Sequence, residues 1–79
     1  MTSYPYIAQV LIKKYDIDPE AIRPEATLTD LGLDSLSIAE LMFDVEDNYD
    51  LDIPDSRMEF TTLGEAAALV DEYIKLKGG

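Results

Sequence analysis

The stretch with the clearest chemical potential places a serine, Ser35, at the predicted start of a helix. Gly32 lies three residues earlier and can adopt a positive φ angle at little cost, which suits a tight turn. Asp34, Ser35 and Ser37 are all residue types that cap a helix by accepting hydrogen bonds from free backbone N–H groups. Ser37 and Glu40 also have the spacing of a capping box. The Oγ of Ser35 is therefore expected beside the positive end of the helix dipole, an environment that suits a phosphodiester.

Ser35 has no evident partner for catalysis. The chain contains no cysteine and no histidine, which removes disulfides, thiolate nucleophiles and the usual acid or base near neutral pH. Carboxylates are abundant, but nothing marks one pair of them for glycoside hydrolysis. Taken alone, the serine and its neighbours also fit an ordinary capped helix with no further role. A self-sufficient hydrolase is therefore not expected.

Charge is the strongest signal in the composition. The chain has 17 acidic and 6 basic residues, which gives a formal net charge of −11. Affinity for nucleic acid comes largely from Lys and Arg, so nucleic acid is excluded as a partner and basic proteins are expected instead. The stretch 24–56 has no basic residue and contains ten acids: Glu25, Asp30, Asp34, Glu40, Asp44, Glu46, Asp47, Asp50, Asp52 and Asp55. Such a run can also be merely a solvated face.

The first part of the chain predicts one helix followed by a long ordered loop. Ser3 is a suitable N-cap and Pro5 is tolerated in a first turn, so we expect a helix over Ser3–Tyr15. The stretch Asp16–Asp34 is long for a loop but is not a polar linker. A short turn of helix is expected near Glu20–Ile22. Five apolar residues can hold this loop against the core: Ile17, Ile22, Leu28, Leu31 and Leu33.

Two further long helices are expected, with a short one between them. Helical spacing of apolar residues extends from Ser35 to about Asp50, and Arg57–Phe60 can form no more than a short third helix or an irregular turn. Thr62 and Glu65 form a capping box before the last helix, which should run to Leu76 or Lys77. The expected fold is all-α, a small four-helix bundle in one domain, residues 1–79, with a long ordered first loop. The core-facing stripes of the last two long helices are Ile38, Leu41, Met42, Val45 and Tyr49, then Leu63, Ala66, Ala67, Val70, Tyr73 and Ile74.

Six acidic or amide residues have the spacing of a calcium-binding loop: Asp44, Glu46, Asn48, Asp50, Asp52 and Asp55. Tyr49 occupies the position that requires glycine, and the last ligand is Asp55 rather than the longer glutamate. Half of the segment also fits a helix. A specific calcium site is therefore not expected, whereas weak binding of divalent cations to the acidic surface is.

No segment predicts membrane insertion. The N-terminus lacks a basic region followed by a long apolar run, and no stretch approaches the ~18 apolar residues of a spanning helix. We expect a monomeric cytoplasmic protein.

Three short motifs resemble the attachment region of acyl carrier proteins. They are Leu31-Gly32-Leu33-Asp34-Ser35-Leu36, Glu40-Leu41 and Asp52-Ile53-Pro54. The resemblance implies a four-helix bundle in which Ser35, flanked by Asp34 and Leu36, carries 4′-phosphopantetheine. A phosphopantetheinyl transferase would esterify Ser35 from coenzyme A, and the prosthetic thiol would then carry an acyl group as a thioester. The reactive sulfur belongs to the prosthetic group and catalysis to partner enzymes, which agrees with the absence of cysteine.

Several related functions stay open. Ser37 stands where many fatty-acid carriers have a second acid, so the resemblance does not select among fatty-acid, polyketide and specialised lipid synthesis. Aminoacyl, peptidyl and D-alanyl carriers share the fold and the serine. An unmodified acidic interaction module, such as an inhibitor or adaptor, is the remaining alternative.

A helical projection predicts a docking face on the helix that begins at Ser35. Opposite its buried stripe, two large apolar residues lie among three acids: Leu36, Glu40, Phe43, Asp44 and Asp47. Charge would steer a transferase or synthase with a basic docking patch, and apolar contact would hold it. Alternatively, Phe43 packs under the first loop as part of the core.

A second prediction concerns the cargo. The arm and its acyl group are expected to fold back, at least partly, between the helix that begins at Ser35 and the last helix, because Ala66, Ala67 and Ala68 leave space there. Small residues also let helices pack closely, so ordinary close packing is the alternative.

Overall fold

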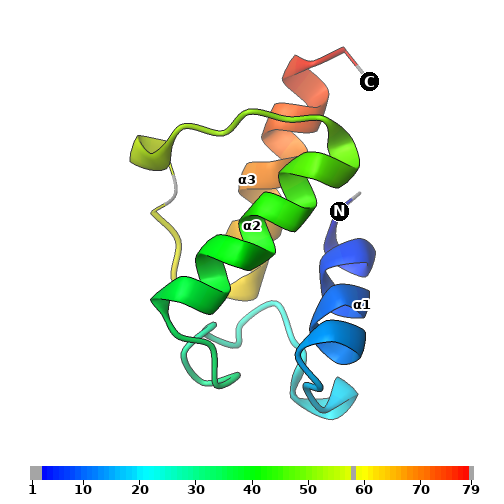
Figure 1. Ribbon diagram of the computed structural model, residues 1–79, viewed down its shortest axis with the longest axis vertical. Helices are drawn as coiled ribbons and strands as arrows, with labels where there is room; N and C mark the ends of the chain where they lie inside the picture. The colour runs from blue at the N-terminus through cyan, green and yellow to red at the C-terminus, as the bar shows by residue number, and fades with distance from the viewer. Residues whose placement is uncertain (1–2, 58, 79) are drawn as a thin grey trace.

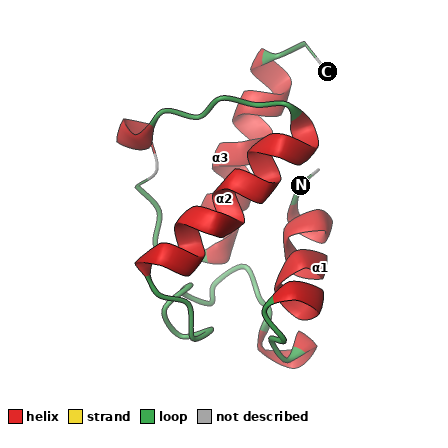
Figure 2. Cartoon of the chain, viewed as in Figure 1, coloured by secondary structure: helices red, strands yellow, loops and turns green. Residues whose placement is uncertain are grey.

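The computed structural model describes residues 3–57 and 59–78. Three α-helices make up most of this part of the chain: α1 (Tyr4–Lys14), α2 (Ser35–Tyr49) and α3 (Leu63–Leu76). α1 packs against both other helices, and α2 crosses α3 at an angle (Figures 1 and 2). The buried core is drawn from all three helices and from the loops between them: Ile7, Leu11, Leu28, Leu31, Leu33, Leu41, Met42, Val45, Ile53, Leu63, Ala67 and Val70.

The helix bounds lie within one residue of those expected, but Ser3 acts differently from the predicted cap. Ser3 occupies the N-cap position of α1 and its side chain makes no capping bond. Its backbone N–H donates to Asp71 Oδ1 at 2.7 Å, and its Oγ donates to the carbonyl oxygen of Ala67 at 3.0 Å. The buried hydroxyl therefore joins the start of α1 to the middle of α3.

The long first loop is ordered, as predicted. A 3₁₀ turn, η1 (Pro19–Ala21), begins one residue earlier than expected, with Asp18 capping it through the N–H of Glu20. Leu28, Leu31 and Leu33 are buried, and Ile17 and Ile22 are partly buried. The apolar anchors that the sequence supplies thus hold the loop on the core.

The loop also pairs with the segment that enters α3. The N–H of Leu28 donates to the carbonyl of Thr61 at 3.2 Å, and the N–H of Leu63 donates to the carbonyl of Ala26 at 2.9 Å. Thr27 and Thr62 form an isolated antiparallel bridge between these bonds. This pairing fixes the loop relative to the N-terminus of α3.

The short third helix that the sequence predicts over 57–60, with an irregular turn as the alternative, is not confirmed. The structure has instead a single 3₁₀ turn, η2 (Asp55–Arg57), closed by the N–H of Arg57 on the carbonyl of Pro54 at 2.9 Å. Glu59 and Phe60 are not helical, and Met58 lies outside the described residues. The backbone after Phe60 pairs with the first loop, so it runs extended instead of continuing as a helix. Within 3–57 and 59–78 the fold is all-helical, with three α-helices and two 3₁₀ turns.

The backbone geometry does not suit a calcium-binding loop. Asp44, Glu46 and Asn48 lie within α2, where the backbone cannot wrap around an ion. In the described part of the chain, no group of three or more acidic side chains is arranged to hold a metal. A separate finding is that no described helix is long and apolar enough to cross a bilayer.

Candidate functional site

The turn before α2 is set by buried leucines and one glycine. Gly32 adopts φ +87°, and its N–H donates to the carbonyl of Thr29 at 2.9 Å. The N–H of Leu33 donates to the carbonyl of Leu28 at 3.2 Å, which closes the turn. Because Leu31 and Leu33 are both buried, the following residues emerge from the core at a fixed place.

Asp34 is the residue that caps α2. Its backbone is extended, and its carboxylate accepts the N–H of Ser37 at 2.8 Å. Ser37 therefore lies in the first turn of α2, and its N–H is capped by Asp34. The prediction that a capping box of Ser37 and Glu40 begins the helix is wrong. The N–H of Ser37 holds the pKa of Asp34 below its ordinary value. An ionised carboxylate consequently lies next to Ser35 at neutral pH.

Ser35 is the first residue of α2 and is exposed. Because Asp34 provides the cap, the Oγ of Ser35 is not used for capping, and it makes no hydrogen bond with any described residue. Leu36, beside it, is 69% exposed. An exposed, unengaged hydroxyl at a rigid helix start fits a covalently attached phosphodiester, which would lie in the field of the α2 dipole. Asp34, Ser35 and Leu36 lie consecutively at this helix start.

The outer face of α2 carries the other predicted residues. Phe43 is 66% exposed and does not pack under the first loop. Glu40 and Asp47 are exposed as well. Asp44 is less accessible because its Oδ2 lies 2.6 Å from the Nζ of Lys14.

Sequence reasoning missed the pairing of Lys14 with Asp44. The only signal was the position of Lys14 in the last turn of α1, which has a local explanation in the helix dipole. Which acid it would meet depends on how α1 packs on α2, and residue spacing does not specify that.

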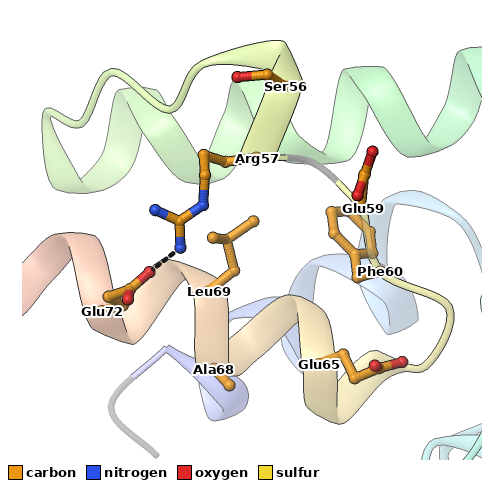
Figure 3. A pocket seen from close by; sticks show the side chains of 8 residues that line it. All are labelled: Ser56, Arg57, Glu59, Phe60, Glu65, Ala68, Leu69 and Glu72. Atoms are coloured by element: carbon orange, nitrogen blue, oxygen red, sulfur yellow. Dashed lines mark hydrogen bonds and ion pairs between the residues drawn. The ribbon is translucent and has the colours of Figure 1, made fainter.

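The predicted space beside the alanines of α3 is mostly filled. Ala66 and Ala67 are buried, and the carbonyl of Ala67 accepts the Ser3 hydroxyl. Of these three alanines, only Ala68 faces a hollow, which has a volume of about 530 Å³ (Figure 3). The hollow lies between α3 on one side and η2 with residues 59–60 on the other. The ion pair of Arg57 with Glu72 closes one end of it. Its lining is Ser56, Arg57, Glu59, Phe60, Glu65, Ala68, Leu69 and Glu72.

A small helical fold that presents an unengaged serine at a helix start is compatible with a carrier domain. The family model for phosphopantetheine attachment sites matches residues 5–70. An acyl carrier protein from Bdellovibrio bacteriovorus is 34% identical over 80 residues, covering 99% of this chain and 97% of its own length. An acyl carrier protein from a Picosynechococcus species is 37% identical over 68 residues, covering 84% of each chain.

The chain therefore belongs to the acyl carrier protein family. It is a carrier and not a catalyst, and its cofactor is 4′-phosphopantetheine.

Proposed function

We propose that Ser35 is the residue that carries the 4′-phosphopantetheine arm. The observation that supports this is the division of roles at the start of α2: Asp34 caps the helix, and the Ser35 hydroxyl is left exposed and unengaged. When bound, the prosthetic group supplies a thiol that holds an acyl group as a thioester. Asp34 keeps the first turn of α2 fixed, and the buried Leu33 holds that turn on the core. The chain thus contributes a rigid attachment point.

The outer face of α2 is the proposed docking surface for partner enzymes. We define the docking face as Leu36, Glu40, Phe43, Asp44 and Asp47. Two strongly exposed apolar side chains among acids support apolar contact combined with electrostatic steering. The partners proposed for it are a phosphopantetheinyl transferase and acyl-transferring or synthase enzymes that present basic patches.

The proposed cargo is an acyl group of fatty-acid, polyketide or specialised lipid synthesis. The two acyl carrier proteins reported above support an acyl cargo over the aminoacyl, peptidyl and D-alanyl alternatives, and over an unmodified interaction module. We further propose that the chain acts as a monomer with one carrier domain.

The attachment site is tested by incubating the protein with coenzyme A, magnesium and a promiscuous phosphopantetheinyl transferase. Mass spectrometry should show one added phosphopantetheinyl group on the wild type and none on Ser35→Ala. Ser37→Ala is the matched control, because it removes a neighbouring hydroxyl two residues away and should still be modified. Modification of Ser35→Ala, or resistance of the wild type, would contradict the proposal.

A further inference from the structure

One basic side chain reaches the docking face from another helix. The Nζ of Lys14, in the last turn of α1, lies 2.6 Å from Oδ2 of Asp44 in α2. The stretch 24–56 contains no Lys or Arg, so positive charge on this face has to come from another element. The hydrogen bond from Lys14 to Asp44 raises the pKa of Lys14, which is therefore a cation at neutral pH.

The ion pair of Lys14 with Asp44 is exposed enough for a cation of a partner protein to replace Lys14. The side chain of Lys14 is 54% exposed and that of Asp44 is 32% exposed. Ion pairs in such positions contribute little to folding, because solvent screens them and two long side chains must be ordered to form them. The same pair still cancels the charge of Asp44 toward an approaching partner, since Lys14 already occupies one of its oxygens.

Lys13, the preceding residue, provides a natural comparison. Lys13 and Lys14 line the same hollow between α1 and α2, with Val10 and Asp44 among its other walls. Among the described residues, Lys13 forms no ion pair. Removing either lysine changes the net charge equally, but only removal of Lys14 uncovers Asp44.

We propose that Lys14 acts as an internal competitor for basic partners, masking Asp44 in the free protein and releasing it on docking. A partner with a cation positioned to replace Lys14 gains the Asp44 contact, and a partner without one encounters a neutral pair. Lys14 therefore limits how strongly Asp44 attracts a basic partner before contact. This inference rests on the docking function proposed above.

The test measures association of the apo protein with a phosphopantetheinyl transferase by stopped flow at low and high ionic strength. Lys14→Met should raise the association rate constant about two- to fivefold above that of Lys13→Met at low salt, the range to which an exposed ion pair corresponds. The difference should vanish at high salt, because such interactions are screened there. It should also vanish when both lysine variants are made in an Asp44→Asn background.

Equal rate constants for the two lysine variants would overturn the inference, as would a difference that survives Asp44→Asn. A second pair of variants separates this outcome from failure of the docking face itself. Glu40→Gln and Asp47→Asn should slow association if the docking face operates, whatever the role of Lys14. If neither slows it, the docking proposal fails. If they slow it while the lysine variants agree, only the role of Lys14 fails.

Discussion

The ammonium group of Lys77, just beyond α3, lies 2.9 Å from the backbone carbonyl oxygen of Asp50, the C-cap residue of α2. It also lies 3.1 Å from the carbonyl of Tyr49 and 3.0 Å from Oδ2 of Asp50. α2 has no basic residue in its own last turn. Lys77 thus supplies the cation that the negative end of the α2 dipole favours.

Lys77→Met should lower the free energy of unfolding by about 1 kcal/mol, because the last carbonyls of α2 lose a charged donor. Urea denaturation followed by circular dichroism measures the change. Lys75→Met is the matched control, since it removes the same charge from the last turn of α3 and Lys75 makes no ion pair with a described residue. An equal loss in both variants would show that overall charge, and not the cap, is responsible.

The sequence predicts the helices and the turn before α2 because both are encoded locally. Leu41, Met42 and Val45 recur at helical spacing, and each is buried as that spacing requires. Gly32 adopts the positive φ angle that its residue type permits, and Asp34 caps α2. These features depend on a few neighbouring residues.

The contacts that the sequence did not predict depend on how helices pack. Lys14 meets Asp44, and Lys77 meets Asp50, only because of the relative placement of α1, α2 and α3. The short helix expected over 57–60, for which an irregular turn was the alternative, is not confirmed for a related reason. Thr61 pairs with Leu28 of a distant loop, which competes with local helix formation. Non-local hydrogen bonds of this kind leave no periodicity in the sequence.

Gly64→Ala should destabilise the protein although Gly64 lies in a helix. Replacing a helical glycine by alanine ordinarily gains about 1 kcal/mol. Here the N–H of Gly64 donates to the carbonyl of Pro24 at 2.8 Å, and an added Cβ would lie 3.0 Å from that oxygen and 3.2 Å from the Pro24 Cβ. We expect a net loss of about 1–2 kcal/mol in chemical denaturation, since backbone and a proline ring cannot easily move aside.

Gly32→Ala is the contrasting variant for this prediction. Its added Cβ would meet nothing within 4 Å, but φ is +87°, so the cost is conformational and about 1 kcal/mol. Gly32→Asn should recover part of that loss, because asparagine tolerates positive φ. Gly64→Asn should recover nothing. Recovery at Gly64 would contradict the steric explanation.

The stabilising role of the Asp34 carboxylate should depend on pH. Its pKa is lowered below the ordinary 3.8, chiefly by the N–H of Ser37, so the native state favours the charged form. The resulting stability is fully present above the unfolded-state pKa and is lost as pH falls through the lower native pKa. The melting-temperature difference between wild type and Asp34→Asn should therefore be constant near neutrality and shrink below about pH 4.

Thermal denaturation at several pH values from neutrality to strongly acidic measures that difference. Asp30→Asn is the control, because it removes an equal charge from an exposed carboxylate outside the helix start. A difference for Asp34→Asn that does not change with pH would contradict the capping role of its charged form.

Salt should stabilise the protein, because a net charge of −11 on 79 residues creates self-repulsion. We expect moderate sodium chloride or millimolar magnesium to raise the melting temperature, mainly by screening the carboxylates of α2 and its flanks. Calcium at the same concentration should do no better than magnesium by more than a small margin, since no described group of acids is arranged as a metal site. A single tight calcium site in titration calorimetry would contradict this expectation.

Substitutions of Phe43 and Leu41, two residues apart on α2, should affect docking and folding separately. Phe43 is 66% exposed, so Phe43→Ala should leave the melting temperature nearly unchanged while it speeds dissociation from a phosphopantetheinyl transferase. Leu41 is fully buried, and Leu41→Ala should cost about 2–5 kcal/mol of folding free energy.

Glu40→Lys should instead slow association and flatten its salt dependence, because an exposed charge acts mainly on the encounter rate. Asp44→Lys should act in the same direction, because it replaces the neutral pair of Lys14 and Asp44 with two adjacent cations. Stopped-flow association and dissociation rate constants, measured beside thermal melts of the same variants, distinguish these effects. A loss of several kcal/mol in Phe43→Ala would place Phe43 in the core and remove it from the docking face.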